Sequence, residues 1–381
     1  MAHLLSAYSN YLGVIPTERP ILNEKFFPLP SSKYIVIHND NKLPSKFYEY
    51  FEEVINLAKP ILHRAGYQIC QVGGPNDPKI SNVDNYYLGL SWGQSFFILK
   101  NASLGVCIDS VIGHACSAYN VPVVSLFSHV YPSQAKPAFG EKLICLEPER
   151  GDKKPSYSAQ ENPKTIRSIK VETVVQSIFD LLNIKVKLNM KTLYVGEHYH
   201  EHVFEVVPDF FTDSAVLKPH TIHFRMDLRN DEKCLAAWLS HNYKMNVISD
   251  KPLNLDLLRQ FKNNVARVTL IIKNHETFLP EYLKSLKAIG LPLVLIAETD
   301  KNISNLREKL FDFTIESDDP IKPLENIPKT AKFWTKKIVL SNGQKYPSIA
   351  HWRENIPLTN ENKIVDCGEF WKDKESFYFY E

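Results

Sequence analysis

The segment 99–127, LKNASLGVCIDSVIGHACSAYNVPVVSLF, indicates the fold of the first half of this 381-residue chain. An apolar run, Leu104–Ile108, ends at Asp109 and Ser110, a helix-forming stretch follows, and a second apolar run spans Pro122–Phe127. Short, continuous apolar runs separated by a helical pattern are typical of parallel strands that are buried on both faces. The segment therefore predicts a strand–helix–strand unit of an α/β domain.

The same alternation continues through both halves of the chain. In the first half we expect strands at Tyr34–His38, Tyr67–Val72, Tyr86–Leu90 and Lys142–Leu146, and helices at Phe47–Ala65, Ser95–Lys100, Ser110–Tyr119 and Val171–Leu182. In the second half we expect strands at Thr192–Val195, Thr221–Met226, Met245–Ser249, Val265–Ile272, Leu291–Ala297 and Phe313–Glu316, with helices at Asp231–His241, Leu255–Asn263, Pro280–Ile289 and Ser304–Phe311. This pattern predicts two Rossmann-like open parallel-sheet domains, whose ligands bind at the carboxyl ends of the strands in a cleft that the two domains face.

We place the domains at residues 1–187, 188–317 and 318–381. The first boundary follows the last helix of the first half, and the polar stretch 147–164 within that half reads as a loop or lid. Residues 318–381 are rich in Pro, Trp, Tyr and Lys, and we expect an irregular C-terminal extension that packs across the domains. A Ser-Asn-Gly sequence at 341–343 predicts a hairpin turn.

Composition excludes several classes of protein. The 45 basic and 43 acidic residues give a net charge of +2, so no global field attracts nucleic acid or an anionic membrane. No apolar run approaches the roughly 20 residues of a membrane span, and the N-terminus has no secretory pattern, so we expect a cytoplasmic protein. The six cysteines are far apart and read as small buried side chains in a reducing compartment.

The end of the strand at Leu104–Ile108 is the first candidate site. The free N–H groups of a helix that begins after Asp109 and Ser110 can hold an anion, with His114 alongside. The alternative is a plain helix cap with a histidine in the core.

The quoted segment resembles the donor-domain signature of the bacterial heptosyltransferases, the ADP-heptose transferases of lipopolysaccharide synthesis, which have the GT-B fold. The strongest part is the Asp-Ser-x-x-Gly-His block at 109–114 with the Pro-Val-Val-x-Leu-Phe strand at 122–127. Residues 7–14, AYSNYLGV, are similar to the segment by which that family enters its donor domain, and KYIVIHND at 33–40 is similar to its first strand. The resemblance covers about residues 1–185.

The resemblance implies a metal-independent glycosyltransferase that uses a nucleotide-diphosphate sugar as donor and needs no cofactor. It assigns donor binding to residues near the strand ends: Asn39, Asp40, Lys46, Asp77, Asp109, Ser110 and His114. Among these, Lys46 would neutralise the departing diphosphate and Asp77 would accept hydrogen bonds from the ribose hydroxyls.

The sequence departs from the family in the loop HND at 38–40, which carries an extra acid, at two glycine positions and in domain order. Val111 and Ser128 stand where the family usually has glycine. In the family an acceptor domain comes before the donor domain, whereas here the donor-like half comes first. We therefore expect a permuted GT-B arrangement in which residues 188–317 form the acceptor side; the alternative is fusion to an unrelated module.

Transfer needs a base for the incoming hydroxyl, and we expect it on the second domain. Glu197 is the first candidate, followed by His198, in the sequence GEHYHEH at 196–202 that follows the strand at Thr192–Val195. A solvated polar loop and a zinc site are the alternatives for this stretch. Arg225 and Asp227, after another strand, would hold the acceptor or form a simple ion pair.

The acceptor expected from the resemblance is a glycan or lipid-linked core. The segment KTAKFWTKK at 329–337 combines basic and aromatic residues that can bind nucleic acid, which gives a first alternative: transfer to a hydroxymethylated base in DNA. The alternative for that segment is a solvent-exposed surface with no binding function. A second alternative is a non-catalytic binding or structural protein that keeps the GT-B fold.

Overall fold

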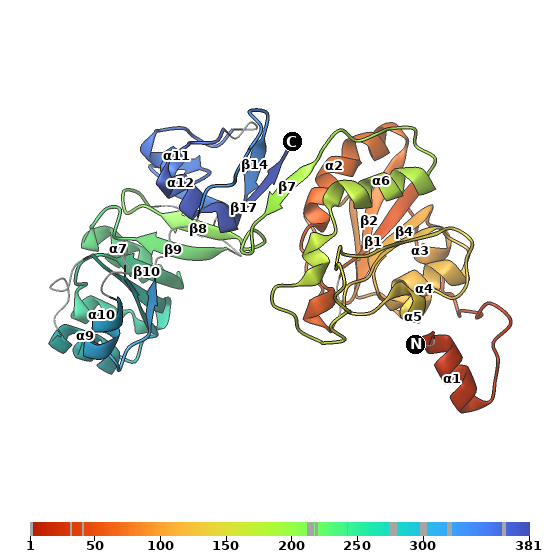
Figure 1. Ribbon diagram of the computed structural model, residues 1–381, viewed down its shortest axis with the longest axis horizontal. Coiled ribbons are helices and arrows are strands. Elements are labelled where there is room, and N and C mark those ends of the chain that lie inside the picture. The colour runs from red at the N-terminus through yellow and green to blue at the C-terminus, as the bar shows by residue number, and fades with distance from the viewer. Residues whose placement is uncertain are drawn as a thin grey trace. The chain divides into compact units, whose positions relative to one another are not determined.

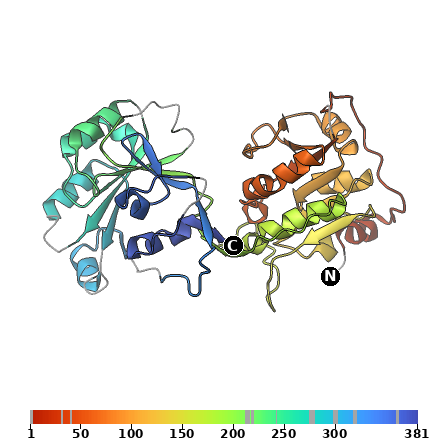
Figure 2. The same ribbon diagram turned by 90° about the horizontal axis from the view of Figure 1, so that it is seen from above.

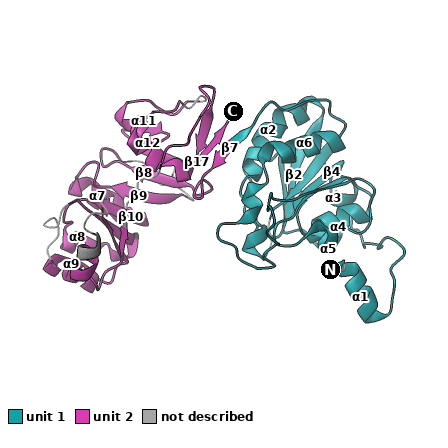
Figure 3. Ribbon diagram, in the orientation of Figure 1, with its two compact units in different colours: residues 1–192 teal, residues 193–381 magenta. Residues whose placement is uncertain are grey.

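The computed structural model describes residues 3–30, 33–39, 42–211, 217, 220–241, 243–273, 280–297, 303–317, 322–359 and 363–381. The chain forms two compact units, residues 1–192 and residues 193–381 (Figure 3). Within the described residues, every helix is too short or too polar to cross a bilayer.

Unit 1 is built on a six-stranded parallel sheet with the order β3-β2-β1-β4-β5-β6 (Figure 1). The strands are β1 (Lys33–His38), β2 (Tyr67–Gly73), β3 (Asn85–Leu88), β4 (Leu104–Ile108), β5 (Val123–Leu126) and β6 (Leu143–Leu146). Strand order reverses between β1 and β4, so the chain leaves these two neighbours in opposite directions. Ligands of doubly wound sheets bind at this point, beyond the carboxyl ends of the strands.

Helices cover both faces of this sheet. The helices of unit 1 are α2 (Phe51–Arg64), α3 (Trp92–Lys100), α4 (Val111–Ala118), α5 (Pro132–Ala135) and α6 (Val171–Leu181), together with α1 (Leu4–Leu12), which has no buried residue and does not cover the sheet. There are 3-10 turns at η1 (Pro44–Lys46) and η2 (Thr165–Ser168). The helices α2 and α6 lie side by side in both views (Figures 1 and 2), while α3 and α4 contribute to a core with alternate residues of β1 and β2. Burial on both faces explains why the strands read as continuous apolar runs.

Helix α4 lies very close to strand β4. A Cβ atom at Gly105 would stand 2.8 Å from the Cys116 sulfur, and one at Gly113 would stand 2.9 Å from the Cys107 sulfur. Both distances are below ordinary van der Waals contact, so glycine at these two positions lets the helix start directly over the end of the strand.

Unit 2 is built on an eight-stranded sheet with the order β13-β12-β11-β10-β9-β8-β15-β16. The strands are β8 (Val203–Val206), β9 (Thr221–Arg225), β10 (Met245–Ser249), β11 (Val265–Ile272), β12 (Leu293–Ala297), β13 (Ile315–Ser317), β15 (Lys337–Ser341) and β16 (Gln344–Tyr346). All are parallel except β16, which pairs antiparallel with β15. Both units therefore confirm the predicted α/β fold with Rossmann-like parallel sheets.

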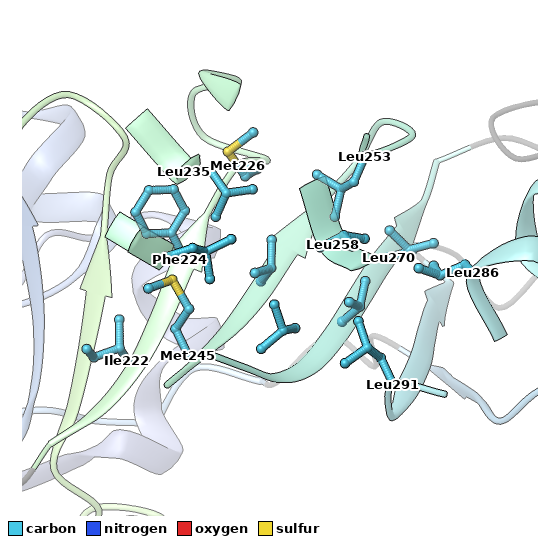
Figure 4. Close-up of a cluster of buried hydrophobic side chains, with 14 of the residues drawn as sticks. Ile222, Phe224, Met226, Leu235, Met245, Leu253, Leu258, Leu270, Leu286 and Leu291 are labelled. Atoms are coloured by element: carbon cyan, nitrogen blue, oxygen red, sulfur yellow. The ribbon is translucent and has the colours of Figure 1, made fainter. Parts of the chain in front are cut away.

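The main core of unit 2 lies between this sheet and its helices (Figure 4). Phe224, Met245 and Leu270 of the sheet pack with Leu235 and Leu286 of the helices. The helices of this layer are α7 (Glu232–Ser240), α8 (Leu255–Gln260), α9 (Pro280–Ala288) and α10 (Ile303–Lys309), with a 3-10 turn at η4 (Lys262–Asn264).

The strand at Thr192–Val195, which is β7, does not belong to the parallel sheet. It lies in a separate three-stranded sheet of order β14-β17-β7, formed with β14 (Lys332–Thr335) and β17 (Phe377–Tyr380). The first strand of the parallel sheet is instead β8, which the sequence analysis did not identify.

The C-terminal residues form regular structure within unit 2, where an irregular extension across the domains was expected. Strand β15 pairs in parallel with β8 and so extends the main sheet at its other end. The helices α11 (Ile349–Arg353) and α12 (Gly368–Lys372) and the 3-10 turn η6 (Lys374–Ser376) complete this part. The hairpin predicted from Ser-Asn-Gly is confirmed between β15 and β16, where Asn342 and Gly343 both have positive φ, as the favoured two-residue turn requires.

Candidate functional site

The carboxyl edge of β1 and β4 in unit 1 carries a buried ion pair. Lys46 ends the 3-10 turn after β1, and its Nζ lies 2.7 Å from Oδ2 of Asp109, which follows β4. The side chains of Lys46 and Asp109 are only 14% and 11% exposed. Lys46 Nζ also donates to the Asp109 carbonyl oxygen at 3.4 Å. The structure thus brings two of the predicted donor-site residues together at the point where strand order reverses.

Ser110 caps helix α4, but its side chain makes no capping hydrogen bond. Its hydroxyl is buried beside the Cys107 thiol and has no partner among the described residues that meets hydrogen-bond geometry. His114 is exposed on α4; its partial desolvation lowers its pKa, while the carboxylate of Asp109 acts in the opposite direction. The backbone N–H groups at this helix start are therefore not used by the side chain that precedes them, and an anion could accept from them.

Asn39 is held in a structural role. Its amide donates to the Tyr48 carbonyl oxygen at 2.7 Å and accepts from the Tyr48 N–H at 3.1 Å, and the side chain is buried. Both ends of the amide therefore already have protein partners. Asp40, the next predicted residue, lies outside the described residues.

Asp77 is turned back onto its own loop. Its Oδ2 accepts from the Gly74 N–H at 2.8 Å and lies 3.8 Å from Nε2 of His38. Burial lowers the pKa of His38 to about 4 despite the opposing charge of Asp77, so His38 is neutral at pH 7.

Two further residues to which the sequence analysis assigned no role, His129 and Arg150, also lie at this edge. Arg150 donates to the carbonyl oxygen of Ser128, and the Ser128 hydroxyl donates to the carbonyl oxygen of Ser45 at 3.0 Å, directly before Lys46. Nδ1 of His129 is buried with no partner among the described residues. The position of His129 shortly after a predicted strand, like that of Asp109, indicates that it lies at the carboxyl edge. No local sequence pattern indicates this for Arg150, which reaches the edge from the loop at 147–164.

The loop at 147–164, which was predicted to be a loop or lid, is hydrogen-bonded along the carboxyl edge. The N–H of Ser45 donates to the Ala159 carbonyl oxygen at 3.1 Å, and its hydroxyl donates to the Ser158 carbonyl oxygen at 2.8 Å. Near its end, Nζ of Lys164 lies 2.6 Å from the buried carboxylate of Glu49. The loop is therefore attached to the turn at Pro44–Lys46 and to the residues that follow it.

In unit 2, the predicted acceptor residues Arg225 and Asp227 belong to a buried charge network. The Arg225 guanidinium binds both oxygens of Asp227, at 2.8 and 2.7 Å, and donates to Glu205 at 2.8 Å. Nζ of Lys337 lies 3.1 Å from Glu205 and 2.9 Å from Asp373. Although burial alone would raise it, the charges of Lys337 and Arg225 lower the pKa of Glu205 to about 2. The network holds Asp227 rigidly at the carboxyl end of β9.

The expected position of Glu197 is wrong, because β7 is not a strand of the parallel sheet. Glu197 lies in an exposed turn beside the small sheet, where its N–H donates to Oε2 of Glu375 at 3.0 Å. His198 forms a local, exposed pair with Glu201 at 3.1 Å. Their role as bases stays a prediction. Across the described residues, no three His, Cys, Asp or Glu side chains are placed to hold a metal ion.

The basic and aromatic segment at 329–337 is not one continuous surface. Phe333 is buried in a core cluster, and Lys337, whose side chain is 17% exposed, is paired within the charge network. Trp334 is 47% exposed. Lys329 and Lys332 are also exposed, so only part of the predicted basic and aromatic surface is present, and nothing further in the described residues supports nucleic acid as acceptor.

These observations define an α/β protein with two Rossmann-like parallel-sheet units, the first of which carries a buried lysine at its strand-order reversal. Over about half its length the chain is similar to solved glycosyltransferases. One is a family 9 glycosyltransferase from Veillonella parvula (19% identity, TM-score 0.35, covering 47% of this chain and 50% of that one). Another is ADP-heptose lipopolysaccharide heptosyltransferase II from E. coli (18% identity, TM-score 0.33, covering 47% and 51%). A third is E. coli heptosyltransferase WaaC, solved with ADP (16%, 0.31, 45% and 48%). The chain spans about half the length of these enzymes. No family model and no curated protein matches it.

Proposed function

We propose that unit 1 binds a nucleotide-diphosphate sugar and that the chain is a glycosyltransferase. The observation that carries the proposal is the pairing of Lys46 with Asp109 at the carboxyl edge of β1 and β4, directly before the start of α4. This is where doubly wound sheets bind nucleotides, and it is where the sequence resembles the donor signature at 109–114.

The chemistry of transfer without a metal needs positive charge near the departing diphosphate. Lys46 supplies one charge, and the N–H groups at the start of α4 supply partial charges. Arg150, linked to Lys46 through Ser128 and Ser45, is a second cation at the same edge; its guanidinium is paired with Glu147 at 2.7 Å, so a diphosphate would compete with that carboxylate too. An incoming diphosphate would compete with Asp109 for Lys46.

The finer parts of the proposal concern the acceptor. A glycan or lipid-linked acceptor would be held by unit 2, with Arg225 and Asp227 on its side and Glu197 or His198 as the base. Replacement of Glu197 by Gln tests the base: it should slow transfer at saturating donor while donor affinity stays constant. Unchanged turnover would remove Glu197 from this role.

A thermal-shift screen against ADP-, GDP-, UDP- and CMP-sugars tests the donor site. A ligand at about 100 times its Kd stabilises the native state by roughly 2.7 kcal/mol, which for a unit of this size raises Tm by about 5–10 °C. The variant Lys46→Met should lose most of this shift.

The matched control is Lys59→Met. Nζ of Lys59 lies 2.6 Å from Asp84, so this variant removes a comparable, half-buried ion pair of unit 1. Because Asp84 precedes strand β3, this pair lies away from the carboxyl edge, and the control should keep the full shift. If no sugar nucleotide stabilises the protein, or if both variants respond alike, the donor site is not where we place it.

A further inference from the structure

A pocket lies in unit 2, at the carboxyl end of β9. It has a volume of about 490 Å³ and is lined by Asp227, Leu228, Trp352 and Arg353. The first two residues follow β9, and the other two end helix α11 (Figure 1). Leu228 and Trp352 pack against a small core that includes Val207.

The topology of the sheet accounts for this position. Strands β8 to β13 follow one another across the sheet in sequence order, while β15 lies on the other side of β8. The strand order therefore reverses at β8 and β15, and Val207, directly after β8, belongs to the core beneath the pocket. Reversal points of open α/β sheets are where ligands bind, beyond the strand ends.

The walls of the pocket combine an apolar surface with fixed acceptors and donors. Leu228 and Trp352 provide the apolar surface. Arg225 holds the Asp227 carboxylate through one bond to each oxygen, so each oxygen keeps a lone pair for a hydroxyl donor. Arg353 donates to Glu369 at 3.1 Å, and its side chain is 58% exposed, so its remaining N–H groups can reach a ligand.

The charge around the pocket argues against a phosphate. The network beneath it has three carboxylates, those of Glu205, Asp227 and Asp373, against the two cations Arg225 and Lys337. Arg353 is already paired with Glu369. An anionic ligand would find Arg225, Lys337 and Arg353 already paired with carboxylates, whereas a neutral polyol would donate hydroxyls to Asp227 and place its C–H face on the indole.

We propose that this pocket binds an uncharged sugar ring, with Trp352 as the stacking surface and Asp227 as the hydroxyl acceptor. If the chain is a glycosyltransferase, this sugar ring would belong to its acceptor substrate, and that assignment alone rests on the proposed function. The pocket as a carbohydrate site stands on its own residues.

The test is a glycan array that carries neutral and phosphorylated oligosaccharides, probed with the fluorescently labelled full chain. Titration of the retained sugars against intrinsic tryptophan fluorescence then gives the affinity. We expect retention of neutral glycans and at least about ten-fold weaker binding by Trp352→Ala and Asp227→Asn. Trp334→Ala is the matched control, since Trp334 is a half-exposed tryptophan of unit 2 that does not line the pocket, and it should bind within about two-fold of the parent chain.

Because Trp352 also packs against the core, Arg353→Ala gives an independent test with an exposed side chain, and it too should weaken binding. Absence of retained glycans, retention of phosphorylated glycans alone, or equal affinity of the Trp352 and Trp334 variants would overturn the proposal. The thermal shift with sugar nucleotides separates the two proposals. Glycan binding without a thermal shift would support the carbohydrate pocket and contradict the proposed transferase function. A thermal shift without glycan binding would support the donor site and contradict the carbohydrate pocket.

Discussion

Replacement of Arg225 by Met should strongly destabilise unit 2. In the native structure Arg225 is the cation that binds both oxygens of Asp227 and one oxygen of Glu205. Methionine fills much of the same volume but carries no charge. Glu205 keeps Lys337 at 3.1 Å, whereas Asp227, with a side chain only 8% exposed, loses the guanidinium that neutralises it.

The expected magnitude follows from that asymmetry. Breaking a buried ion pair by removing one partner costs about 3–5 kcal/mol, mostly because a charge is left buried without compensation. For a unit of this size each kcal/mol lowers Tm by about 2–4 °C, so the loss should be roughly 6–20 °C. The double variant Arg225→Met/Asp227→Asn should recover part of the loss, since the uncompensated charge is then gone.

Thermal unfolding followed by tryptophan fluorescence measures this change, because four of the five tryptophans lie in unit 2. The matched control is Arg259→Met, which removes an exposed pair with Asp256 at 2.6 Å and should cost less than about 1 kcal/mol. A loss in Arg225→Met no larger than in the control, or a double variant less stable than the single one, would refute the argument from uncompensated charge.

Three further predictions concern unit 1. The variant Gly105→Ala should lose about 1–3 kcal/mol of unfolding free energy, measured by thermal unfolding, because its Cβ would stand 2.8 Å from the Cys116 sulfur. The control Gly368→Ala, where no atom of the described residues lies within reach of the added Cβ, should change the unfolding free energy by less than about 0.5 kcal/mol. Burial lowers the pKa of His38 to about 4, so protonation favours the unfolded chain, and the urea midpoint of unit 1 should fall as the pH drops from about 6.5 towards 4. The urea midpoint of His38→Asn should fall less over the same pH range. An equal fall of the midpoint in both proteins would contradict this prediction. Burial raises the pKa of the Cys107 thiol to about 12, so a thiol reagent at pH 8 should modify Cys107 and Cys116 only in denaturant, and rapid native modification would show that the core opens.

Much of the fold could be predicted because it is local. Strands buried on both faces carry continuous apolar runs, and the helices between them keep a helical apolar period, so most elements of both units were found close to their observed bounds. The Asn342-Gly343 turn was also predictable, since its two positive φ angles require those residue types. The short strand β8, with Glu205 in its middle, was missed because a charged residue interrupts the apolar run.

The site was harder to predict because its partners come from distant parts of the chain. Lys46 and Asp109 were both named, but nothing in the sequence shows that they form one ion pair. The resemblance assigns Asn39 to donor binding, whereas its amide is hydrogen-bonded to the Tyr48 backbone. Lys337 looked like a surface cation, and only the pairing of β15 with β8 shows why it lies in the charge network.

The insertion of β15 beside β8 has a consequence for synthesis of the protein. Unit 1 has all its strands and helices once residue 181 has left the ribosome, so it can fold while the chain is still growing. Unit 2 must wait for β15 to cover the edge of β8 and for β17, at residues 377–380, to join β7. Until then the early strands of unit 2 expose an unpaired edge, which makes this half of the nascent chain the part that a chaperone would be expected to protect.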